Sequence, residues 1–212
     1  MPKIGQEEID AVVSVMKSGM LTSSLGAGPK VLEFEKNFAC FAGVKHAIAV
    51  NTGTAALHAS ILAAQLKAGD EVILPSFTFV ATAEAVALSG AKVVFADIDP
   101  LTYTLSPTAV KNALTSKTKA IIPVDLYGLP ANTKSIKELA AAHDLIVIED
   151  CAQSHGACYE GRPAGALADM ACWSLYAAKN IGTGEGGVVT TDSDELAEKV
   201  RMVRTHGEKV KY

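Results

Sequence analysis

The chain has 212 residues, of which 49% are hydrophobic and 20% charged, and its formal net charge is −4. This apolar content can build a large core, which excludes a mainly disordered protein. The negative charge and the lack of a basic run argue against nucleic acid as a partner. No stretch approaches the roughly 20 apolar residues of a membrane span, and residues 1–8 lack the apolar region of a signal peptide. We therefore expect a cytoplasmic protein.

The cysteines and histidines are not spaced as metal ligands. None of Cys40, Cys151, Cys158 and Cys172 forms a Cys-x-x-Cys pair, and the five histidines form no His-x-x-x-His pair. No metal site is expected. Buried free thiols in a reducing cytosol explain the cysteines more simply.

Residues 1–45 are predicted to be a helical segment. Apolar residues at helical spacing predict a first helix over 5–18, with Ile9, Val12, Val13 and Met16 on one stripe. Gly19 ends it, and the composition of 21–28 predicts a loop. Pro29 opens a second helix, because the first turn does not need its missing N–H. Its stripe of Val31, Phe34, Phe38 and Phe41 is typical of core.

From residue 46 onward, apolar runs alternate with helical segments, which predicts one large domain over 46–212. The expected strands are 46–50, 71–74, 92–96, 120–124 and 145–149. The expected helices between them are 54–66, 79–89, 106–114 and 132–143. Strands that are apolar on both faces and separated by helices indicate a mostly parallel sheet with helices on both faces.

After Asp150 the alternation changes. Two short strands, 170–174 and 187–191, have no full helix between them, so we expect one antiparallel strand. Residues 193–204 form a last helix, with Ser193 as its cap. The fold class is therefore α/β, without internal repeats or an interdomain linker. Ligands of such sheets bind beyond the carboxyl ends of the strands.

Two strand ends carry features of a ligand site. The first is followed by 51–57 (NTGTAAL), a small-residue turn at a helix N-terminus, where free N–H groups can bind phosphate. A plain helix cap by Thr52 or Thr54 is the structural alternative. The second is followed by Phe79, which can stack on a planar ligand or belong to the core.

The fifth strand ends in two acids, Glu149 and Asp150, which strand alternation sends to opposite faces. A carboxylate at that depth needs a cation or strong donors, and a protonated pyridine nitrogen would serve. Hydrogen bonding to loop amides is the structural alternative for one of the two acids.

Lys179 stands alone between small and apolar residues, before a glycine-rich turn. Desolvation lowers the pKa of a lysine and makes its amine nucleophilic, as Schiff-base chemistry requires. A solvated loop lysine is the alternative. A phosphate cradle, a ring platform, a deep carboxylate and an isolated lysine together match the needs of pyridoxal phosphate (PLP).

The same stretches resemble a known family. The runs 51–57 (NTGTAAL), 69–73 (GDEVI), 78–82 (TFVAT), 118–124 (TKAIIPV), 148–153 (IEDCAQ) and 179–187 (KNIGTGEGG) are similar, in order, to the DegT/DnrJ/EryC1/StrS family of PLP-dependent sugar aminotransferases. The resemblance implies an aspartate-aminotransferase-like (fold type I) large domain and a homodimer. It also implies transfer of an amino group, commonly from glutamate, to a nucleotide-linked keto-deoxysugar, as in polysaccharide biosynthesis.

The resemblance also implies a role for individual residues. Lys179 matches the Schiff-base lysine, and Asp150 matches the partner of the pyridine nitrogen. Phe79 lies where the family stacks an aromatic residue on the ring, and Gln153 lies beside the 3-hydroxyl face. The phosphate contacts of the family match Thr54, Ala55 and Ser174.

Two features depart from the family. The loop 21–28 is longer than the family's usual turn near the sugar site, and the chain stops where relatives continue into a smaller C-terminal domain. We therefore expect the large domain with that small domain absent. A non-catalytic PLP-binding or regulatory fragment remains an alternative. A sugar dehydratase that uses pyridoxamine phosphate is a weaker one, because such relatives have histidine at the position of Lys179.

Overall fold

The computed structural model describes residues 3–22 and 27–208. Residues 23–26 of the expected loop 21–28 therefore lie outside the described part of the chain. Within it, the helices are α1 Gln6–Ser18, α2 Pro29–Ala42, α3 Gly53–Ala63, α4 Ala81–Leu88, α5 Pro107–Ala113, α6 Thr133–Ala142 and α7 Asp194–Arg204, with a short 3₁₀ turn η1 at Leu126–Gly128.

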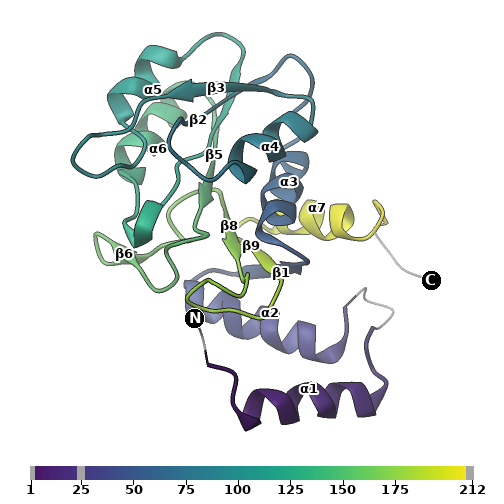
Figure 1. The fold of residues 1–212 in the computed structure, drawn as a ribbon. Helices are drawn as coiled ribbons and strands as arrows, with labels where there is room; N and C mark the ends of the chain where they lie inside the picture. Colours follow the sequence, from purple (N-terminus) through teal and green to yellow (C-terminus); the bar gives the residue numbers. More distant parts are fainter. Residues whose placement is uncertain (1–2, 23–26, 209–212) are drawn as a thin grey trace.

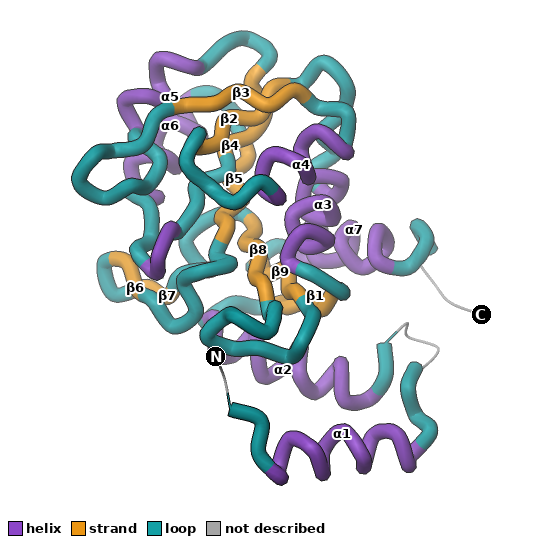
Figure 2. The backbone as a smooth tube through the Cα atoms, viewed as in Figure 1, coloured by secondary structure: helices purple, strands orange, loops and turns teal. Residues whose placement is uncertain are grey.

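The strands form one large sheet and a small hairpin (Figures 1 and 2). The large sheet contains β1 His46–Val50, β2 Glu71–Pro75, β3 Lys92–Ala96, β4 Thr118–Ile121, β5 Ile146–Asp150, β8 Met170–Ser174 and β9 Gly187–Thr191, and the hairpin contains β6 Cys158–Tyr159 and β7 Arg162–Pro163. The strand order in the large sheet is β1-β9-β8-β5-β4-β2-β3. Within the large sheet of the described residues, β9 is the one strand that runs antiparallel to its neighbours, so the prediction of one antiparallel strand is confirmed.

Helices cover both faces of this sheet, as expected from strands that are apolar on both faces. Helices α3, α4 and α7 pack on one face, where Val72, Leu74 and Ile148 point. Helices α5 and α6 pack on the other face against Ile73 and Val147. Helix α2 continues that second layer over β1, β8 and β9.

The aromatic side chains of α2 differ in burial, because some lie in the core and others face solvent. The ring of Phe38 is buried, 5.4 Å from that of Trp173, whereas Phe41 at the end of the helix is exposed. The first helix differs more. Helix α1 forms where expected, but none of its residues is buried, and its stripe of Ile9, Val12, Val13 and Met16 faces solvent.

Three further expectations need correction. Strand β4 ends at Ile121 rather than at 124, because Pro123 has no N–H to donate to a ladder. Helix α4 starts at Ala81 rather than at 79, which leaves Phe79 in the preceding turn. The four cysteines are free thiols, but Cys40 and Cys158 are exposed rather than buried.

Candidate active site at the carboxyl edge of the sheet

A cavity of about 540 Å³ opens beyond the carboxyl ends of the parallel strands, where α/β sheets bind ligands. It brings together most of the candidate residues, although they come from five separate segments of the chain. Its lining includes Thr54, Phe79, Asp150, Gln153, Ser174 and Lys179. Ala55 does not line this cavity; it lines a separate one, together with Asn51 and His58.

Helix α3 begins at the floor of the cavity. The cap alternative is confirmed for Thr52, because its Oγ1 accepts the Ala55 N–H at 2.9 Å. Where the start of α3 passes close to the end of β8 and the start of β9, there is no room for a side chain at Gly53 or Gly187. A Cβ on Gly53 would lie 2.8 Å from the Cβ of Ser174, and one on Gly187 would lie 2.1 Å from the carbonyl oxygen of Thr52. The close approach places Ser174 beside the first turn of α3.

Asp150 ends β5 and is 5% exposed. Its Oδ1 accepts the Ala152 N–H at 3.1 Å, and its Oδ2 accepts the Thr82 hydroxyl at 2.9 Å. Burial raises the pKa of Asp150, while these two hydrogen bonds and the charge of Lys179 act in the opposite direction. In the described part of the chain, no ion pair includes Asp150. The acid therefore faces the cavity without a cation in contact.

Lys179 lies in the loop after β8, and its backbone N–H donates to the carbonyl of Tyr176 at 2.8 Å. The residue is half-buried, and both neighbours, Ala178 and Asn180, are exposed. The surroundings are therefore less apolar than the sequence suggested. The Lys179 amine is one wall of the same cavity that Asp150 faces.

Phe79 is 70% exposed and lines the cavity, so the core alternative for this residue is wrong. On another wall, the Oε1 of Gln153 accepts the Tyr127 N–H at 2.8 Å, which fixes the orientation of the amide. The aromatic ring and the oriented amide are contributed by different loops of the same strand edge.

Comparison with known proteins identifies the family of this chain. The family model of the DegT/DnrJ/EryC1/StrS aminotransferase family matches residues 2–212. The chain belongs to this family. It is 44% identical over 206 residues to GDP-perosamine synthase from Caulobacter vibrioides, a match that covers 97% of this chain and 55% of that enzyme.

Solved structures similar to this chain confirm the predicted α/β fold. An aminotransferase from Psychrobacter cryohalolentis superposes with a TM-score of 0.94 and 40% identity over 98% of this chain and 52% of that one. NtdA from Bacillus subtilis with bound cofactor PMP gives a TM-score of 0.84 and 35% identity over 93% of this chain and 45% of that one. The chain thus spans about half the length of the relatives it matches.

The structure also adds residues to the family motifs that sequence reasoning missed. Thr82 holds Asp150, and its Oγ1 is 2.9 Å from that of Thr78, which lies before the start of α4. Tyr176 and Glu185 line the cavity as well.

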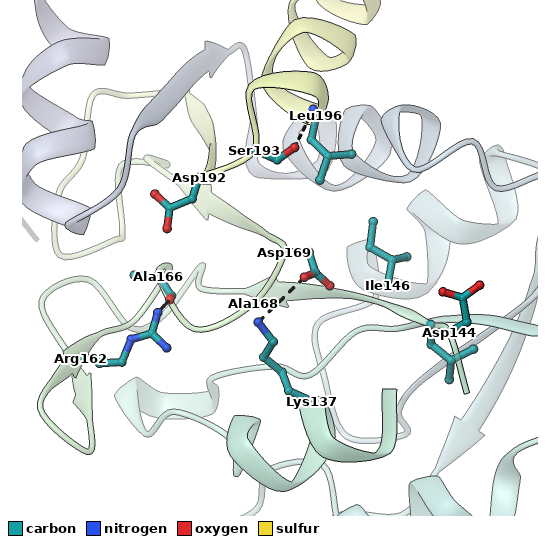
Figure 3. A pocket seen from close by; sticks show the side chains of 11 residues that line it. Lys137, Asp144, Ile146, Arg162, Ala166, Ala168, Asp169, Asp192, Ser193 and Leu196 are labelled. Carbon is teal, nitrogen blue, oxygen red and sulfur yellow. Dashed lines mark hydrogen bonds and ion pairs between the residues drawn. The ribbon is translucent and has the colours of Figure 1, made fainter. Parts of the chain in front are cut away.

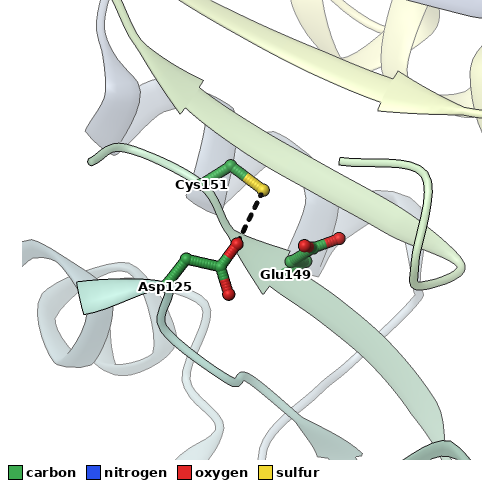
Figure 4. A group of neighbouring side chains, drawn as sticks. All are labelled: Asp125, Glu149 and Cys151. Carbon is green, nitrogen blue, oxygen red and sulfur yellow. Dashed lines mark hydrogen bonds between the residues drawn. The ribbon is translucent and has the colours of Figure 1, made fainter. Parts of the chain in front are cut away.

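Glu149, the other acid of β5, points away from this site. It is fully buried, and its Oε2 accepts the Gly165 N–H at 3.1 Å, so the structural alternative for one of the two acids is confirmed. Beside it lie Asp125 and Cys151, neither of which the sequence singled out for this site (Figure 4).

A cavity of similar size lies at the opposite edge of the sheet, near the starts of β5 and β8 (Figure 3). Its charged side chains have partners nearby: Lys137 lies 3.9 Å from Asp169, and Arg162 donates to the carbonyl of Ala166. None of the candidate residues lines it.

None of the helices in the described part is long and apolar enough to cross a membrane.

Proposed function

We propose that this chain is the PLP-binding large domain of an aminotransferase that moves an amino group from an amino acid to a nucleotide-linked keto-deoxysugar. One observation carries the proposal: a buried carboxylate without a paired cation faces a cavity that an isolated lysine and an exposed aromatic ring also line. Family membership agrees with it.

The residues of the cavity fit PLP. Asp150 would face the ring nitrogen, because a buried carboxylate is most stable beside a cation and this one has none in contact. Phe79 would stack on the ring, with Gln153 at its 3-hydroxyl. Thr54 and Ser174, at the start of α3, would contact the phosphate, where helix N-termini favour anions. Ala55 remains a candidate, although its N–H is already bonded to Thr52.

When bound, PLP supplies an electron-accepting ring. The side chains of this protein would hold the cofactor in position and control the transfer of protons. Asp150 keeps a proton at the ring nitrogen, and Thr82 together with the Ala152 amide holds Asp150 in place. The Lys179 amine would be the point of covalent attachment, and it would act as general acid and base toward the proton of the donor's Cα.

The substrate class comes from relatives. GDP-perosamine synthase is named for a nucleotide sugar, which supports a nucleotide-linked sugar as the amino acceptor. Glutamate is the donor we propose, in the cytoplasm and for polysaccharide biosynthesis. The division into a helical segment over 1–45 and a large domain over 46–212 belongs to the same proposal.

We further propose a homodimer. Four large apolar side chains of α1 face solvent in the single chain: Ile9, Val12, Val13 and Met16. Apolar patches of this kind are typical of protein interfaces. Phe77, Tyr103 and Tyr127 form a second exposed apolar group, in which the ring centroid of Phe77 lies 6.2 Å from that of Tyr103 and 6.5 Å from that of Tyr127.

A non-catalytic PLP-binding fragment is the second candidate, because the chain spans about half the length of its relatives. The dehydratase alternative is disfavoured by the lysine at position 179. Both candidates that remain predict PLP binding, and only the first predicts turnover once the rest of the protein is present.

Covalent trapping tests the site. Borohydride treatment of the PLP-loaded protein should fix the cofactor on Lys179, as read by peptide mapping. Lys179→Arg should abolish the adduct, whereas Lys134→Arg, at an exposed site on α6, should leave it unchanged. An adduct on another lysine would refute the assignment.

A further inference from the structure

Behind the cavity, on the other side of β5, lies a carboxyl pair that the proposed chemistry does not use. Asp125 and Glu149 are both 0% exposed. Their oxygens and the Cys151 sulfur lie within 4.8 Å of one another (Figure 4). In the described part of the chain, neither acid takes part in an ion pair.

One oxygen of this carboxyl pair, Oε1 of Glu149, lacks a hydrogen-bond donor among the described residues. Oδ1 of Asp125 accepts the Ala131 N–H at 3.0 Å, and its Oδ2 accepts the Ser154 hydroxyl at 3.0 Å and the Cys151 thiol at 3.6 Å. Oε2 of Glu149 accepts the Gly165 N–H, but its Oε1 is buried without a partner among the described residues. A buried acceptor without a donor is costly, and two adjacent buried carboxylates repel each other strongly.

A single proton between the two acids removes both costs. Burial, and after it the charge of Glu149, raise the pKa of Asp125 well above its usual range. Burial also raises the pKa of Glu149, but hydrogen bonding from Asp125 opposes that rise. Oε1 of Glu149 lacks a donor among the described residues, and a protonated Asp125 beside it can supply one.

We propose that Asp125 is protonated in the folded protein and donates to Oε1 of Glu149, and that this carboxyl–carboxylate bond positions Asp150 and Gln153. The bond ties the loop after β4 to strand β5 and to the loop after it. Hydrogen bonds to charged acceptors are the stronger ones, particularly away from water.

The connection to the cavity runs through the backbone of the two loops. The Asp125 N–H donates to the Asp150 carbonyl at 3.0 Å, and the Tyr127 N–H donates to Oε1 of Gln153 at 2.8 Å. The Ser154 hydroxyl, one residue after Gln153, donates to Asp125. Asp125 is therefore a positioning residue, and its effect on cofactor binding rests on the proposed function, while the carboxyl pair itself does not.

The protonation state can be read directly by infrared spectroscopy. The wild-type protein at neutral pH should show the C=O stretch of a protonated carboxylic acid, which Asp125→Asn should remove and Asp150→Asn should retain. No such band, or a band that only Asp150→Asn removes, overturns the proposal whatever the protein's activity.

Stability and PLP affinity test the positioning role. Asn mimics a protonated Asp and can donate to Glu149, so Asp125→Asn should keep its urea midpoint and bind PLP within about threefold of wild type. Asp125→Ala should lower the midpoint and weaken PLP binding by about tenfold or more. The single tryptophan, Trp173, lines the cavity and provides the fluorescence signal. Glu138→Gln, at an exposed site, is the control.

Two further results would overturn the proposal. If Asp125→Asn is as destabilised as Asp125→Ala, the site needs two charged carboxylates. If a chelator lowers the wild-type midpoint and Mn²⁺ or Zn²⁺ alone restores it, a cation rather than a proton joins the two acids. If PLP shows no binding to the wild type while the infrared band is present, the carboxyl pair stands and the proposed function fails.

Discussion

Asp150 shows how a residue proposed to bind a cofactor can work against stability. Its pKa is raised by burial, so its protonated form is the one that folding favours. The stability it contributes is fully present below its unfolded pKa and is lost as the pH rises through the folded value. At neutral pH the ligand-free chain therefore carries an unfavourable buried charge, which a cation in the cavity would offset.

Asp150→Asn should separate these two effects. Without cofactor, the variant should have a higher urea midpoint than wild type at neutral pH, and the two should converge in acid. With cofactor, its half-reaction with an amino-acid donor should slow by about two orders of magnitude or more. Asp97→Asn, at an exposed site, should change neither property. Near-normal transamination by Asp150→Asn would mean that another acid holds the ring nitrogen.

How far the sequence predicts the site differs from residue to residue. Asp150, Lys179, Phe79, Gln153 and Ser174 follow strands whose order and hydrophobicity are readable, and all line one cavity. The contribution of Thr82 was not readable, because it depends on a hydrogen bond to a residue 68 positions away. Asp125 was missed for the same reason, since Glu149 in strand β5 and the donors in the loop after β5 are more than 20 positions away.

Among the secondary-structure elements, agreement between sequence and structure follows the strength of the local signal. Strands β1, β3, β8 and β9 have the predicted bounds, because apolar runs and turn residues delimit them. Strands β6 and β7 were not predicted, since two residues carry no periodicity. That α1 would be exposed was also not readable, because an amphipathic stripe does not say what covers it.

One ion pair joins elements from both faces of the sheet. Arg204 of α7 contacts Glu35 of α2 at 2.5 Å and donates to the carbonyl of Ala49 in β1 at 3.1 Å. Glu35 in turn accepts the Ala49 N–H at 2.8 Å. The side chains are 15% and 9% exposed, so water screens the pair little.

Glu35→Ala should destabilise the protein by about 3–5 kcal/mol, because it leaves the Arg204 charge buried without its partner. Glu33→Ala is the matched control two residues away, since its pair with Lys30 is exposed. We expect that change to cost at most about 1 kcal/mol. Urea denaturation measures both, and equal losses would contradict the importance we assign to burial.

The apolar face of α1 provides the first prediction for the whole molecule. Val12→Asp should shift the protein from dimer to monomer in analytical ultracentrifugation, without changing the far-UV circular dichroism spectrum, because Val12 is exposed in the single chain. Ser14→Asp places the same charge on the opposite side of α1 and should leave the dimer intact. A Val12→Asp protein that remains dimeric would exclude this face from the interface.

The second prediction for the whole molecule concerns the length of the chain. The 212-residue chain alone should bind PLP weakly and transaminate slowly, because groups that cover the site and hold the substrate would come from the part that relatives have in addition. The relatives' remaining region, supplied in cis or as a separate chain, should restore activity. Turnover of the isolated chain at roughly 1 s⁻¹ or faster would show that the site is already complete.

The place of β9 in the sheet has a consequence for how the protein folds. Strand β9 lies between β1 and β8, with Val50 opposite Gly187. The first and the last strand of the sheet in chain order are therefore direct neighbours in space. Contacts between such distant residues form slowly, since the loop between them must first be closed. During synthesis, β1 has no partner in the sheet until β9 has emerged from the ribosome, and the floor of the cavity cannot close earlier. The edge that carries the candidate site is thus among the last parts of the described sheet to form.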